Sequence, residues 1–84
     1  MRRLDRADAR EIAKSDLVPG FAVLMKERPG KYNFDENAFL GTSDSNLLGI
    51  VEFYSSLVKK GMGWKGAVAL TYEEARERSF EGCR

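Results

Sequence analysis

The carboxylates that could take part in acid-base chemistry form two adjacent pairs, Asp35 with Glu36 and Glu73 with Glu74. General acid-base catalysis needs two such groups in unlike environments, so that one is protonated while the other is ionised. Neighbours in sequence rarely differ in this way, and Glu73 and Glu74 suit a helix first turn, where they balance the dipole. With Asp44, the first pair could offer oxygens to a divalent cation, but the spacing follows no known calcium-binding loop. We therefore predict neither a carboxylate active site nor a metal site.

The chain of 84 residues contains no histidine and a single cysteine, Cys83. The absence of histidine removes the usual general base near neutral pH, the usual zinc ligand and the usual partner of a serine or cysteine nucleophile. A lone cysteine forms no intramolecular disulfide and no cysteine-rich metal site. We expect a protein that is not an enzyme and that uses no cofactor.

The segment Gly61-Met62-Gly63, followed by Lys65 and Gly66, has the glycine-rich and basic composition of a phosphate-binding loop. Backbone amides in such loops approach an anion closely. The segment lacks the G-x-x-x-x-G-K-[ST] order of that motif. A connection between two helices explains it better.

Met62 and Trp64 are large side chains in this glycine-flanked segment, and Tyr72 follows them. Residues of these types either anchor a loop to the core or contact a partner protein. Both interpretations stay open for Trp64. We take Met62, Trp64 and Tyr72 as the candidate protein-binding residues.

The 14 basic and 13 acidic residues give a formal net charge of +1, so a nucleic-acid contact would depend on local clusters of basic residues. The basic residues are most concentrated in residues 1–14 and 59–65. The candidates for phosphate contact are Arg2, Arg3, Arg6, Arg10, Lys59, Lys60 and Lys65. We keep nucleic-acid binding as the alternative function, which a salt titration distinguishes from apolar protein contact.

Residues 3–15 are rich in helix formers, with Asp5 near the start and Lys14 near the end, as the helix dipole favours. They predict an N-terminal helix. Its large apolar residues are only Leu4 and Ile12, so the helix is thinly anchored and leaves a homodimer open.

Residues 17–40 fit two patterns. Apolar residues alternate on either side of a Pro29-Gly30 pair, at Phe21, Val23, Met25, Tyr32 and Phe34. Because this pair suits a type II turn, we predict a β-hairpin. The competing interpretation is a short helix that Pro19 opens and that continues through Arg28. Residues 38–40 either add a third strand or lead directly into the next helix.

Residues 44–60 predict an amphipathic helix from the apolar positions Leu47, Ile50, Val51, Tyr54, Leu57 and Val58. Ser43 or Asp44 can cap its first turn, and Gly61 can end it. Thr71 and Glu74 have the spacing of a capping box, which predicts a helix from Tyr72 to about Phe80. Residues 64–70 are left as a short helix or a strand.

These elements predict a single domain over residues 1–84 with an α+β fold: an N-terminal helix, a β-hairpin or short meander, a central amphipathic helix and a C-terminal helix. An all-α fold is the alternative. No apolar run approaches the roughly 18 residues of a membrane span, and the charged first ten residues are unlike a signal peptide. We expect a cytoplasmic protein with no membrane partner.

Residues 61–74 read G-M-G-W-K-G-A-V-A-L-T-Y-E-E. This run resembles a W-x-x-A-x-x-L-T-x-x-E pattern of small phage-encoded accessory proteins, including some tail-assembly chaperones. The resemblance implies a small cytoplasmic protein that acts by contact with another macromolecule. We therefore expect a protein-binding module, such as an inhibitor, adaptor or assembly factor of phage or mobile-element type.

Overall fold

The structure is a computed structural model that describes residues 5–31 and 33–78, and it places no strand in either range. The elements are α1 (Arg6–Ile12), the π-helical segment η1 (Ala13–Leu17), α2 (Val18–Glu27), α3 (Glu36–Leu40), α4 (Asp44–Lys59) and α5 (Trp64–Glu77). The predicted α+β fold is therefore wrong, and the all-α alternative is confirmed.

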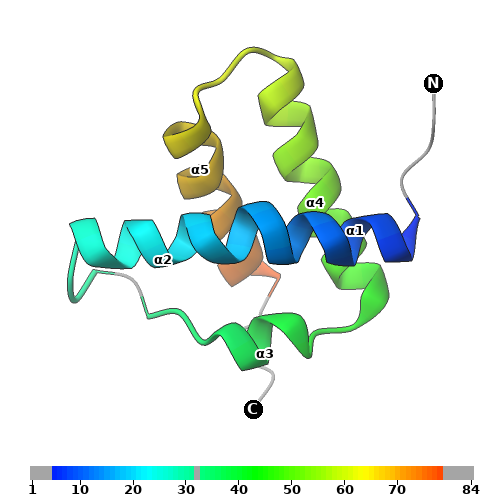
Figure 1. Cartoon of the computed structure of the whole chain (residues 1–84), viewed down its shortest axis with the longest axis horizontal. Helices are drawn as coiled ribbons and strands as arrows, with labels where there is room; N and C mark the ends of the chain where they lie inside the picture. Colours follow the sequence, from blue (N-terminus) through cyan, green and yellow to red (C-terminus); the bar gives the residue numbers. More distant parts are fainter. Residues whose placement is uncertain (1–4, 32, 79–84) are drawn as a thin grey trace.

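The elements α1, η1 and α2 join into one long helical rod (Figure 1). Pro19 lies inside this rod. In a regular α-helix proline has no N–H to donate to the carbonyl four residues earlier, here that of Ser15, and its ring would clash with that carbonyl. The helix widens at this point, since the Val18 amide bonds to the Ala13 carbonyl, five residues back. The wide turn separates Pro19 from the carbonyl that it would meet in a regular α-helix, so the rod continues through the proline.

The predicted β-hairpin over residues 17–40 is wrong, because residues 18–27 are helical, as the competing interpretation had it. The alternation of apolar residues was misleading: in residues 17–27 the fully buried large side chains are Leu17 and Phe21, with Leu24 nearly so, and these follow helical spacing. Residues 38–40 lie in α3 and form no strand. Tyr32 lies outside the described residues.

The predicted Pro29-Gly30 turn does form, but at the end of a helix. The Lys31 amide donates to the Arg28 carbonyl at 3.1 Å, and Gly30 has a φ of +84°. The positive φ is one that glycine adopts without steric cost. The local turn signal was correct, and the expectation that it joins two strands was not.

The predicted helix over residues 44–60 is confirmed as α4. Ser43 caps it, with its hydroxyl accepting a hydrogen bond from the Asn46 amide at 3.2 Å. Gly61, with a φ of +90°, follows its end. The start signal and the stop signal both hold.

The C-terminal helix begins at Trp64 and not at Tyr72, so the predicted capping box is wrong. Thr71 is fully buried inside α5, where its hydroxyl donates to the Ala67 carbonyl at 2.6 Å. The stretch 64–70, left open by its sequence, is the first half of this helix. One face of α5 is buried along nearly its whole length, at Ala67, Val68, Thr71, Tyr72 and Ala75.

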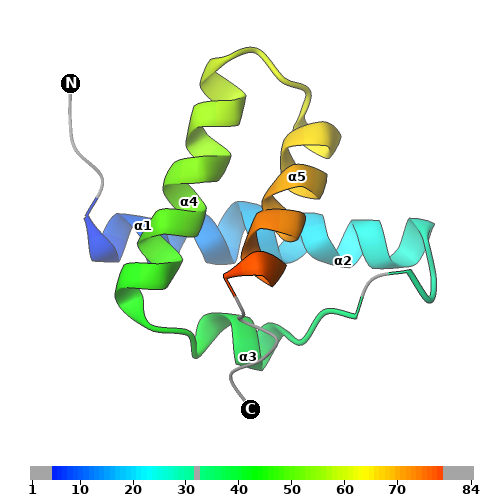
Figure 2. The same cartoon turned by 180° about the vertical axis from the view of Figure 1, so that it is seen from behind.

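The helices α4 and α5 form an antiparallel pair that crosses the long rod (Figures 1 and 2). The helix α3 lies beside the end of this pair that is opposite to the α4–α5 loop. Phe21 is the centre of the core. Its ring makes edge-to-face contacts with Phe34, Phe39 and Tyr72, at centroid distances of 5.0, 5.4 and 5.2 Å. Such pairs add to the free energy gained by apolar burial. This cluster joins α2, α3 and α5, and thereby fixes the base from which the α4–α5 pair projects.

Candidate protein-binding surface

Exposed apolar side chains gather where α4 ends and α5 begins. Val58 is 47% exposed, Met62 37% and Trp64 44%. They lie within one helical turn on either side of the short α4–α5 loop, whose reversal uses the positive φ of Gly61. We call this surface the tip, and it consists of Val58, Lys59, Lys60, Met62, Trp64 and Lys65.

Trp64 is held by α2 while much of its ring stays open. A β-carbon built on Gly20 would lie 3.4 Å from Trp64 Cζ2, so one edge of the indole rests on the α2 backbone. Next to it, Lys65 forms an ion pair with Glu27 of α2 at 2.7 Å. The ring is therefore both packed and exposed, which answers the question that the sequence left open.

Met62 folds back over the first turn of α5. A β-carbon on Gly66 would meet Met62 Cγ at 3.4 Å and Sδ at 3.5 Å. Its thioether chain is flexible and polarisable, so it can adjust to the shape of a contacting surface. The tip thus combines a positioned aromatic ring with an adaptable neighbour.

Tyr72 belongs to the core. Its side chain is fully buried, its ring contacts Phe21, and its hydroxyl accepts a hydrogen bond from the Asn33 amide at 3.1 Å. Of the three candidate protein-binding residues, Met62 and Trp64 are exposed at the tip, whereas Tyr72 is buried in the core.

The candidate phosphate-contact residues that the structure describes fall into two separate groups. Lys59, Lys60 and Lys65 lie at the tip, whereas Arg10 lies at the opposite end of α4, beside Asp44. The helix between them has 16 residues, which corresponds to about 24 Å at a rise of 1.5 Å per residue. The two groups do not form one continuous basic face.

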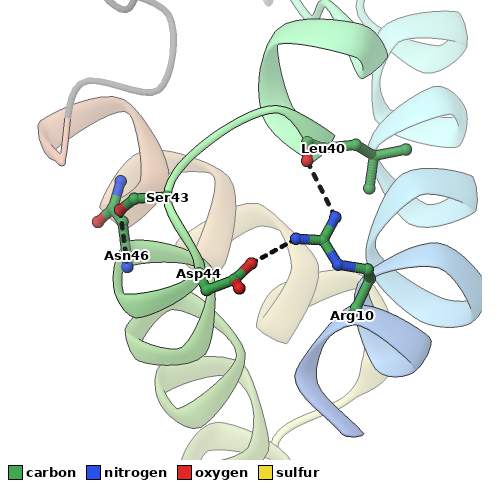
Figure 3. Close-up of polar contacts among 5 residues, drawn as sticks. All are labelled: Arg10, Leu40, Ser43, Asp44 and Asn46. Atoms are coloured by element: carbon green, nitrogen blue, oxygen red, sulfur yellow. Dashed lines mark hydrogen bonds and ion pairs between the residues drawn. The ribbon is translucent and has the colours of Figure 1, made fainter. Parts of the chain in front are cut away.

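Arg10 is also engaged within the fold (Figure 3). Its guanidinium donates to the Leu40 carbonyl at 3.1 Å and pairs with the Asp44 carboxylate. It thereby ties α1 to the end of α3 and the start of α4. Arg6 is exposed on α1, and Arg2 and Arg3 lie outside the described residues.

The carboxylate pairs have structural contacts. Asp35 caps α3 by accepting from the Asn37 and Ala38 amides at 3.0 and 3.3 Å. On α5, Glu74 pairs with Arg78 at 2.8 Å, and Glu73 lies 4.0 Å from Arg76. Within the two described ranges, no three acidic or cysteine side chains converge as metal ligands would. Cys83 lies outside these ranges.

A polar pair that the sequence did not suggest lies between the long rod and α4. Burial raises the pKa of the Tyr54 phenol, and the nearby Asp16 carboxylate, which accepts its hydrogen bond, raises it further. Tyr54 is only 6% exposed. Its hydroxyl is therefore a fixed contact of α4 with η1 and is not part of the tip.

Sequence reasoning also missed Val58, which was placed on the buried stripe of α4. It lies on the last turn of that helix, where no described element covers it, and the stripe ends in the structure at Leu57. The position of Val58 one residue from the end of α4 was the available signal, because the last turn of a helix has fewer neighbours to cover it.

Comparison with known protein families, with curated proteins and with solved structures found no match to this chain. Among the described residues, no helix has both the length and the apolarity that crossing a membrane requires.

Proposed function

We propose that this protein is a non-enzymatic protein-binding module whose tip contacts another protein, as an inhibitor, adaptor or assembly factor of the phage accessory type does. The proposal depends chiefly on Trp64, which is 44% exposed although its ring rests on α2. Tryptophan is enriched among the residues that dominate binding free energy at protein interfaces. Because this ring is already positioned, binding would cost it little side-chain entropy.

The composition of the tip supports a contact that is apolar at its centre and charged at its edge. Val58, Met62 and Trp64 supply the apolar part, and Lys59, Lys60 and Lys65 supply a charged rim, in which Lys65 pairs with Glu27 of α2. Protein interfaces commonly have such an apolar centre and polar rim. A partner surface with an apolar cleft bordered by carboxylates would complement it.

Affinity capture from a lysate of the native host tests the proposal, with the wild-type protein compared to Trp64→Ala and Leu70→Ala. Leu70 is a matched control, because it is also 44% exposed and lies on α5 outside the tip. We expect wild type and Leu70→Ala to retain the same protein and Trp64→Ala to lose it, with unchanged circular dichroism. Equal capture by all three variants would contradict a role of the tip.

Nucleic-acid binding stays the alternative, and the three tip lysines are its main candidates. The same protein can be titrated with a labelled duplex and a labelled single strand at rising salt. Phosphate contacts predict an affinity that falls linearly with the logarithm of salt concentration. Two results together would favour the alternative. Lys60→Glu would lose the binding of nucleic acid, and Trp64→Ala would leave the capture of the host protein unaffected.

A further inference from the structure

A second apolar surface lies on α2, on the side of this helix away from α5. Gly20, which faces α5, and Ala22 are two residues apart, and this spacing turns a helix by about 200°. A groove of about 480 Å³ opens on the Ala22 side. We call it the α2 groove, and it is lined by Val18, Ala22, Met25, Lys26, Phe34 and Glu36.

The floor of the groove is apolar, and the side chain at its centre, that of Ala22, is small. Val18, Met25 and Phe34 are half-buried and pack against the core, whereas Ala22 is exposed between Val18 and Met25. The α2 members recur at the spacing that forms one stripe along a helix. A methyl group at the centre of this stripe lets another helix approach closely.

The two charged residues of the groove lie toward opposite ends. Lys26 is next to the last residue of α2, close to the turn at residues 28–31. Beyond this turn the chain runs back along α2 to α3 (Figure 1), whose first residue is Glu36. Neither Lys26 nor Glu36 forms an ion pair with another described residue. The groove is therefore positive at one end and negative at the other.

We propose that the α2 groove is the contact surface of a homodimer, in which the α2 helices of two copies pack antiparallel across a two-fold axis near Ala22. A two-fold interface requires each copy to supply both members of every contact. In the antiparallel arrangement Lys26 of each copy meets Glu36 of the other, giving two opposite-charge pairs. A parallel arrangement would place like charges together, so the charge pattern selects the antiparallel one.

The charge of the whole chain also suits a second copy as the occupant. A formal net charge of +1 gives two copies little mutual repulsion. The tip is a poorer dimer surface, because its lysines would face the lysines of the other copy. Since the groove lies on the other side of α2, the dimer leaves both tips accessible, and the inference does not depend on the proposed function.

Sedimentation equilibrium over a concentration series tests the dimer, starting with the wild-type chain of 9.5 kDa. We expect twice this mass at high concentration. Lys26→Glu and Glu36→Lys should each weaken dimerisation about tenfold, because two attractive pairs become two repulsive ones. The double variant Lys26→Glu/Glu36→Lys should regain the wild-type affinity.

Mixing the two single variants gives the sharpest readout. A mixed dimer restores both opposite-charge pairs, so the mixture should dimerise more tightly than either variant alone. Lys60→Glu and Glu52→Lys carry the same changes of net charge outside the groove and should dimerise as the wild type does. A wild-type chain that stays monomeric up to about 1 mM would overturn the proposal and leave the groove to an unrelated partner. A dimer that neither charge reversal weakens would overturn it as well.

Discussion

Gly20 of α2 lies directly against Val68 of α5: a β-carbon built on Gly20 would come within 2.8 Å of Val68 Cγ2 and 3.0 Å of Cγ1. Real β-carbons essentially never approach a neighbour as closely as the shorter of these distances. The long rod and α5 therefore cross at a point where one of them has no side chain. The same crossing supports Trp64, whose ring rests beside Gly20.

Gly20→Ala should lower the free energy of unfolding by about 1 kcal/mol. Overpacking a core costs about 1–3 kcal/mol, and the stiff Val68 side chain yields poorly, while alanine returns up to about 1 kcal/mol of helix propensity. Urea denaturation measures the change. In a Val68→Ala background the substitution should cost less, because the clashing methyl groups are gone.

Gly66→Ala is the matched control for this change. Gly66 lies in the first turns of α5, and a β-carbon there would meet only Met62, at an ordinary contact distance of 3.4 Å. It should therefore raise the stability by about 0.5–1 kcal/mol through helix propensity alone. If both glycine variants had the same effect, the close contact with Val68 would not be the cause.

The sequence predicted α4 well because its signals agree. A cap at Ser43, a long apolar stripe and a stop at Gly61 all indicate the same helix. The rod was harder to recognise because Pro19 suggests a helix start, while in the structure a π-helical turn carries the helix through it. Apolar spacing does not reveal that wide turn, because a helix start at Pro19 and a rod that continues through it share the same residue pattern.

The tip was only partly predictable for a related reason. Composition singled out Met62 and Trp64, but it could not separate them from Tyr72, because the burial of Trp64 and Tyr72 depends on which face of α5 meets the rod. That face was obscured when Thr71 was taken as a cap. Once α5 begins at Trp64, helical spacing alone places Tyr72 on the buried side with Val68.

Gly63→Ser should stabilise the protein by a few tenths of a kcal/mol to about 1 kcal/mol. Gly63 is the N-cap of α5 and offers no side chain to the first free amides. Its φ of −62° and ψ of 152° nearly equal those of Ser43, −60° and 148°, whose hydroxyl caps α4. Serine can therefore supply the same hydrogen bond here, and a β-carbon at this position meets nothing within 4 Å.

Thermal denaturation of Gly63→Ser and Gly63→Ala separates two sources of added stability: the capping hydrogen bond, and the reduced backbone freedom of the unfolded chain when any residue replaces glycine. Alanine has the β-carbon without the hydroxyl, so it should lack the gain that serine shows. Equal melting temperatures for the two variants would argue against a capping hydrogen bond.

Arg10→Lys should lower the stability by about 0.5–1 kcal/mol although it keeps the charge. The guanidinium reaches the Leu40 carbonyl and the Asp44 carboxylate together, which a single ammonium group does less well. The partly exposed ion pair with Asp44 limits the loss. Arg6→Lys, an exposed change on the same helix, should leave the urea midpoint unchanged, and a matching drop in both would refute a specific role of Arg10.

Tyr54 should make the stability fall at high pH. Burial, and then the Asp16 carboxylate, raise the pKa of this phenol above its ordinary value of 10.0. The folded protein therefore holds the phenolic proton at pH values where the unfolded chain has released it. This contribution is fully present below about pH 10 and is lost as the pH rises through the folded-state pKa.

Because lysines titrate in the same range, the contribution of Tyr54 has to be isolated by comparison with Tyr54→Phe. At pH 8 this variant should be less stable than the wild type by about 1 kcal/mol, since it lacks the hydrogen bond to Asp16. The difference should shrink as the pH rises above 10, because only the wild type loses the contribution of a protonated Tyr54. Urea titrations of both proteins between pH 8 and about pH 11 measure this, and parallel profiles would contradict a raised pKa.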